Sequence, residues 1–208
     1  MEIVNVLNFI AVLRGRYVDF YGDFIDPFCY VGFHNLRVAA EEARLLIRWR
    51  GFEMSPDTPP EGAAFQTAQN SDLRAGMWAS VGGFAQKAGL EISDPGFVPK
   101  TQAAHRLVLN WRGDLRVKNP LIERIYQAYL SDKKNIGDDS ILIEIASRFG
   151  VSHEACQAML KGDVQKLLRR HEKAAVAARF PGLPAYRFQT ETLFGALSAA
   201  QWRRVFKT

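Results

Sequence analysis

Hydrophobic and polar positions alternate from residue 17 to 25, in a stretch rich in Val, Phe, Tyr and Ile that predicts a β-strand. Asp26-Pro27 then predicts a helix start, because Asp is a favoured N-cap and Pro suits the first helical position. The helix is expected to run to about Arg44. A second strand begins at Leu45 and ends before the proline-rich "SPDTPPEG". The opening of the chain is therefore a βαβ unit.

The middle of the chain, from Ala63 to Ala178, has helical periodicity in nearly every segment. Glycines and prolines divide it, and polar residues predict where helices begin. The expected boundaries are a break at Gly89, a cap at Thr101, a helix start at Asn119-Pro120, a start at Asp138 or Asp139, an end at Gly150, a start at Ser152 and a long helix from about Asp163 to Arg179.

Strand character returns in "PGLPAYRFQ" and "TLFG", which predict a hairpin, and Ser198 with Gln201 has capping-box spacing for a terminal helix. The order is βαβ, a helical block, then ββα. We therefore predict an α/β domain split by an all-helical insertion. Residues 17–62 and 179–208 form the discontinuous α/β domain, residues 63–178 form the inserted helical domain, and residues 1–16 are an N-terminal extension.

Composition narrows the class of protein. A hydrophobic share of 48% and a charged share of 24% are those of a soluble globular protein. Two distant cysteines, Cys29 and Cys156, do not make a disulfide scaffold, which favours a reducing, cytoplasmic setting. The apolar N-terminus carries Glu2 where a signal peptide needs positive charge and is too short to span a bilayer, so no membrane association is expected.

The net charge of +5 makes an anionic partner conceivable. Basic residues are scattered, however, and no nucleic-acid motif accompanies them, so we expect no nucleic-acid binding. The four histidines show neither metal-ligand spacing nor a cysteine pattern, and no metal site is predicted.

Four blocks in order, "DFIDPFCYVG", "IRWRGFEMSPDTPPEG", "TQAAHRL" and "FPGLPAYRF…LFGA", resemble the DsbA family of thioredoxin-fold proteins, most closely its FrnE-like branch. The resemblance covers roughly residues 17–206 and implies a thioredoxin-like fold. It implies that Pro184 is the family's cis-proline, whose loop faces the reactive centre. Cys29 falls on the second cysteine of the family's C-x-x-C motif, whereas Asp26 stands where the first, nucleophilic cysteine belongs. Ordinary dithiol exchange, which needs both thiols, is therefore not expected.

A related branch also resembles the chain in fold. Kappa-class glutathione transferases and 2-hydroxychromene-2-carboxylate isomerases carry a serine at the position of Asp26, and there glutathione brings the thiol. Ala196-Leu197 replace the Ser-Asp pair that tends to hold the glutamyl end of glutathione in those relatives. No cofactor is assigned with certainty, and glutathione is the one candidate.

The residue types at the reactive centre leave two roles open for Asp26. A helix N-terminus and its amide donors lower the pKa of a capping carboxyl, whereas a dry pocket walled by Phe28 and Trp78 raises it. Asp26 is then either a plain N-cap or a catalytic, ligand-orienting group. The helix dipole also lowers the pKa of Cys29, yet a residue three positions after the cap usually turns inward, which favours a buried thiol.

We name Asp26 and Cys29 as candidate catalytic residues. The candidate substrate-binding residues are Pro27, Phe28, His105, Leu183 and Pro184. Three functions are carried forward: an enzyme of isomerase or tailoring type acting on a small organic or thiol-linked molecule; a one-cysteine thiol–disulfide oxidoreductase using Cys29 with glutathione or a protein thiol; and a non-catalytic binding or assembly protein. A homodimer is left open.

Overall fold

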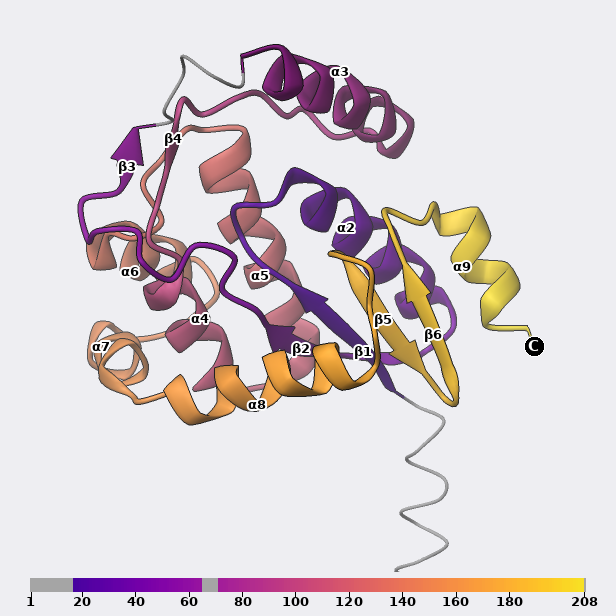
Figure 1. The fold of residues 1–208 in the computed structure, drawn as a ribbon. Coiled ribbons are helices and arrows are strands. Elements are labelled where there is room, and N and C mark those ends of the chain that lie inside the picture. Colours follow the sequence, from indigo (N-terminus) through magenta and orange to yellow (C-terminus); the bar gives the residue numbers. More distant parts are fainter. Residues whose placement is uncertain (1–16, 65–70, 208) are drawn as a thin grey trace, which may run out of the picture.

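The computed structural model describes residues 17–64 and 71–207 of the 208-residue chain; the predicted N-terminal extension lies outside them. Its main sheet has the strand order β2-β1-β5-β6 (Figure 1). The first strand, β1 (Tyr17–Gly22), pairs in parallel with β2 (Leu46–Gly51) and antiparallel with β5 (Ala185–Phe188). Strand β6 (Glu191–Phe194) completes the hairpin with β5. This is a thioredoxin-like α/β fold with a helical insertion, as the sequence predicts.

Helix α2 (Pro27–Glu42) connects β1 to β2 and begins where the sequence predicts. Asp26 is its N-cap and accepts a hydrogen bond from the Phe28 N–H, while Pro27 occupies the first helical position. Arg44, with φ of 54°, lies just past the helix end. Helix α9 (Ala199–Val205), which begins with the predicted Ser198–Gln201 capping box, packs against α2.

Most of the polypeptide between the two halves of the main sheet is helical, as expected. The helices are α3 (Ser71–Ala88), α4 (Gln102–Leu109), α5 (Leu115–Leu130), α6 (Asp139–Ser147), α7 (His153–Lys161) and α8 (Gln165–Ala177). Two very short strands, β3 (Ala63–Ala64) and β4 (Phe97–Val98), form a separate antiparallel ladder that the helical prediction missed. A two-residue strand leaves no alternation in the sequence to detect.

One predicted helix start needs correction, and one predicted cap lacks its side-chain hydrogen bond. Asn119-Pro120 does not start α5, which begins at Leu115 with Asp114 as its cap and carries Pro120 inside it. Burial of Leu121 offsets the one backbone hydrogen bond that the proline removes. Thr101 does occupy the N-cap position of α4, but its side chain makes no capping hydrogen bond.

One hydrophobic core spans both parts of the chain. It joins Phe20 and Trp49 of the sheet to Leu107 of α4, Tyr126 of α5 and Trp202 of α9, all of them buried. Helix α8 lies along β2 (Figure 1). His171 of this helix contacts the guanidinium group of Arg50. Within the described residues, no helix is both long and apolar enough to cross a bilayer.

Candidate active site at the start of helix α2

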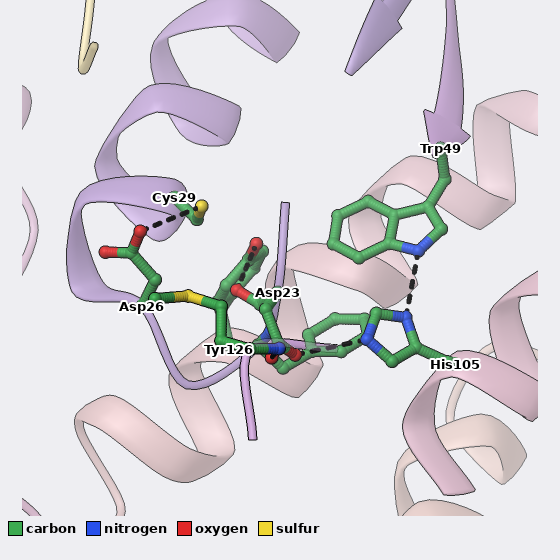
Figure 2. Close-up of polar contacts among 8 residues, drawn as sticks. Asp23, Asp26, Cys29, Trp49, His105 and Tyr126 are labelled. Carbon is green, nitrogen blue, oxygen red and sulfur yellow. Dashed lines mark hydrogen bonds and ion pairs between the residues drawn. The ribbon is translucent and has the colours of Figure 1, made fainter. Parts of the chain in front are cut away.

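The turn between β1 and α2 places Asp26 at the N-terminus of helix α2. Its Oδ1 accepts the Phe28 N–H at 2.8 Å. Its Oδ2 accepts the thiol of Cys29 at 3.2 Å (Figure 2). Only 9% of Asp26 is exposed. The residue is the N-cap of α2 and, at the same time, an almost completely buried carboxyl group.

Of the two opposing effects on the pKa of Asp26, burial is the larger. Desolvation raises the pKa of Asp26 from 3.8 to about 6, against the lowering effect of the hydrogen bonds from Cys29 and Phe28. The negative charge of Asp23 adds to the rise. A carboxyl group with a pKa close to neutrality exchanges protons efficiently near physiological pH, so this cap has the properties of a general acid or base.

Cys29 lies inside the protein with no exposed surface. Burial and the adjacent Asp26 carboxylate raise the pKa of its thiol well above the usual value, so the thiol stays protonated at neutral pH. The predicted inward orientation of this side chain is thus what the structure has. Both cysteines of the chain are free and buried.

We expect Cys29 to react with iodoacetamide only when the protein unfolds, because neither access nor a thiolate is available in the native state. Residue-resolved mass spectrometry after labelling between pH 6 and pH 9 would check this. Cys156, which is also buried, serves as the internal comparison. Labelling of native Cys29 with a midpoint below about 8.5 would contradict the buried-thiol description.

The loop before β5 lies against α2. The peptide bond between Leu183 and Pro184 is cis, and the Pro184 ring packs where a side chain on Gly32 would otherwise stand, 2.9 Å from the ideal Cβ position. The Tyr186 hydroxyl lies on the same side of Gly32, is fully buried and has no hydrogen-bond partner within the described residues. A glycine in α2 is what allows this close approach.

The remaining predicted site residues divide into two groups. Pro27 is buried in the first turn, and Phe28 is half-buried with its ring 6.0 Å from the exposed ring of Phe84. His105, in contrast, has no exposed surface and pairs with the equally buried Asp23. It therefore lies on the interior side of the turn, where it cannot contact a ligand as predicted. Sequence reasoning passed over Asp23, although its spacing three residues before Asp26 was the available signal.

A large hollow in the described surface lies elsewhere. It measures about 730 Å³ and lies between the α4–α5 connection and helix α7, lined by Trp111, Val117, Phe149 and Met159 among others. Neither this hollow nor the two smaller ones is lined by Asp26, Cys29 or Pro184. In the described part of the chain, no cluster of three or more His, Cys, Asp or Glu residues is arranged to hold a metal ion.

The fold agrees with the comparison to known families. The sequence model of the DSBA-like thioredoxin domain matches residues 17–207. The chain belongs to this family. Among the curated proteins, the uncharacterized protein YwbO of Bacillus subtilis (strain 168) is 26% identical over 171 residues, 78% of this chain and 83% of its own.

Solved structures share the DSBA-like fold. The probable DsbA oxidoreductase SCO1869 of Streptomyces coelicolor superposes with a TM-score of 0.77 at 21% identity, covering 92% of this chain and 88% of its own. A 2-hydroxychromene-2-carboxylate isomerase gives 0.66 at 19% identity, covering 86% and 89%. The cytosolic disulfide reductase DsbM of Pseudomonas aeruginosa, solved with GSH, gives 0.68 at 18% identity, covering 92% and 97%. The fold thus serves proteins described as oxidoreductases and as an isomerase.

Proposed function

We propose that this DSBA-like protein is an enzyme that acts by proton transfer on a small organic or thiol-linked molecule, with Asp26 as its acid/base group. The observation that carries the proposal is the carboxyl group itself. It lies buried at the N-terminus of helix α2 and has a pKa raised to about 6. By the sequence resemblance to the family, it also stands where the first cysteine of the C-x-x-C motif is expected. If Asp26 were only an N-cap, its carboxylate would be solvated and its pKa would be lowered.

The reaction type that fits is an isomerisation without net oxidation. At pH 7 the Asp26 carboxylate is largely ionised and can take a proton from a substrate carbon or thiol. The same proton is then returned to another atom of the substrate, so no external oxidant or reductant is needed. The Cys29 thiol, which donates to Oδ2, holds the carboxyl in one orientation during both transfers.

In this proposal, the exposed part of Asp26 and the residues around it supply the binding contacts. Phe28 gives an apolar wall, Pro27 and Pro184 with Leu183 form the rigid sides, and His105 acts from behind without touching the ligand. We propose a thiol-linked substrate, such as a glutathione conjugate, because a structural neighbour of this fold was solved with GSH. A cytoplasmic location is proposed with it, since both cysteines are unpaired.

The other two functions make different demands. A one-cysteine oxidoreductase needs an accessible thiolate, which the burial and raised pKa of Cys29 disfavour. A non-catalytic binding or assembly protein needs only a surface, and a homodimer of this chain remains a prediction. These alternatives predict different results in one experiment.

The test uses S-phenacylglutathione, whose acidic C–H bonds lie between sulfur and a carbonyl group. The wild-type protein is expected to bind it and to accelerate exchange of those hydrogens with D₂O, because Asp26 can remove them. Asp26→Asn should slow the exchange by about 10²–10⁴-fold, the usual contribution of general acid–base catalysis. Asp138→Asn, which alters the exposed cap of α6, should leave the rate unchanged.

Each alternative has its own signature in that assay. Binding without exchange would support the non-catalytic protein and contradict the enzyme. A mixed disulfide at Cys29 after treatment with oxidised glutathione, without exchange, would support the oxidoreductase. Absence of both binding and exchange would overturn the assignment of a glutathione-linked substrate.

A further inference from the structure

Asp23 is a completely buried carboxylate that holds the turn before α2 from several sides. Its Oδ1 accepts the Phe24 N–H at 2.7 Å and the His105 Nε2–H at 3.1 Å, and its Oδ2 accepts the Met54 N–H at 2.7 Å. Its backbone carbonyl accepts the Tyr126 hydroxyl at 3.0 Å. One residue therefore joins the turn to the segment after β2 and to helices α4 and α5.

The neighbours of His105 define how its ring is protonated. Trp49 Nε1–H can only donate, and it points at His105 Nδ1 at 3.3 Å, so Nδ1 is the acceptor and the proton lies on Nε2, facing Asp23 (Figure 2). Tilted ring contacts hold the imidazole as well, because the rings of Phe24 and Trp49 lie with their centroids 5.2 and 5.8 Å from its own. His105 is thus a fixed, neutral donor to the Asp23 carboxylate.

Asp26 lies three residues further along the same turn. Its backbone N–H points at the Asp23 carbonyl at 3.5 Å, and its carboxyl is fixed only by Phe28 and Cys29. The ionisable groups that act on it are Asp23 from the turn, Cys29 from α2, Tyr126 from α5 and Tyr186 from β5. Asp23 therefore acts on Asp26 both through the backbone of the turn and through its charge.

From this geometry we propose that the hydrogen-bonded chain Trp49–His105–Asp23 is the positioning device of the site. A helix of the inserted part, α4, thereby controls a reacting group that it does not touch. This positioning role deepens the proposed function, on which its catalytic meaning rests, and it specifies how His105 acts on the site without contacting the ligand.

The test compares His105→Leu, which removes the donor, with His105→Gln, whose amide can still donate to Asp23. The amide of Phe28 reports the position of Asp26 directly, because its hydrogen bond goes to Oδ1. Hydrogen exchange at this amide is expected to be faster by about 10-fold or more in His105→Leu and near wild type in His105→Gln. The NMR titration midpoint of Asp26 should fall toward the ordinary carboxyl value in His105→Leu and be restored in His105→Gln.

His171→Leu is the matched control. His171 is also buried, contacts an arginine of β2 and lies on another inserted helix, α8, so its loss perturbs packing without touching the turn. Phe28 exchange and the Asp26 midpoint should stay unchanged in this variant. If His105→Leu does not fold, Trp49→Phe, which removes the donor to Nδ1 together with part of a buried indole, should shift both readouts in the same direction by a smaller factor.

Unchanged Phe28 exchange and an unchanged Asp26 midpoint in His105→Leu would overturn the positioning role, as would equal effects in His171→Leu. Neither readout uses a ligand. The proposed enzyme activity can therefore fail while the positioning chain survives, and the positioning chain can fail while D₂O exchange of the glutathione conjugate still depends on Asp26.

Discussion

Asp26→Asn is expected to make the protein more stable at pH 7.5, raising the free energy of unfolding by about 1–3 kcal/mol. Folding raises the pKa of this carboxyl from 3.8 to about 6, so above pH 6 the native state carries a charge that it disfavours by up to about 3 kcal/mol. Asparagine keeps the cap and removes the charge. Denaturant unfolding of both proteins at several pH values measures the difference.

The stability of the wild-type protein is expected to depend on pH with a definite sign. Because the pKa is higher in the folded state, the wild type is not penalised below pH 3.8, and its stability decreases as the pH rises through 6. The advantage of Asp26→Asn should therefore vanish below pH 4. Asp138→Asn, at the exposed cap of α6, should show no such pH-dependent gain. A destabilised Asp26→Asn at pH 7.5 would mean that the carboxylate contributes to folding and is not strained by burial.

Gly32→Ala should lower the free energy of unfolding by about 1–3 kcal/mol, the usual cost of overpacking. An ideal Cβ at this position would lie 2.3 Å from the Tyr186 hydroxyl and 2.9 Å from the Pro184 ring. Both are held in the packed layer between α2 and β5. Thermal or denaturant unfolding would measure the loss.

Gly83→Ala is the matched control in another helix. An ideal Cβ on Gly83 of α3 meets nothing within 4 Å, so the substitution should stabilise the protein by about 0.5–1 kcal/mol through helix propensity. Stabilisation by Gly32→Ala as well would show that the Pro184 loop does not press on α2.

Local sequence signals were sufficient for most of the framework. The Asp26-Pro27 helix start, the Ser198–Gln201 capping box and the hairpin after Pro184 all lie where short-range chemistry predicts them. The start of α5 was wrong because Asn119-Pro120 looked like a cap, whereas burial further along the helix outweighs the missing hydrogen bond of the proline.

The sequence predicted only part of the site. Which effect controls the pKa of Asp26 depends on how much water the folded chain excludes, and that is a tertiary property. The pairing of Asp23 with His105 joins positions 82 residues apart, so no local pattern revealed it. His105 was singled out as a pocket residue, but the fold places it behind the turn, where it meets Asp23.

The most direct test of the account is the titration of the Asp26 side-chain carboxyl carbon by NMR in the wild-type protein, assigned by comparison with Asp26→Asn. We expect a titration midpoint of about 6 for Asp26, the value of a carboxyl buried at the reactive centre and able to exchange protons near neutrality. A midpoint at or below 3.8 would show a solvated, ordinary helix cap and would contradict the proposed role of Asp26.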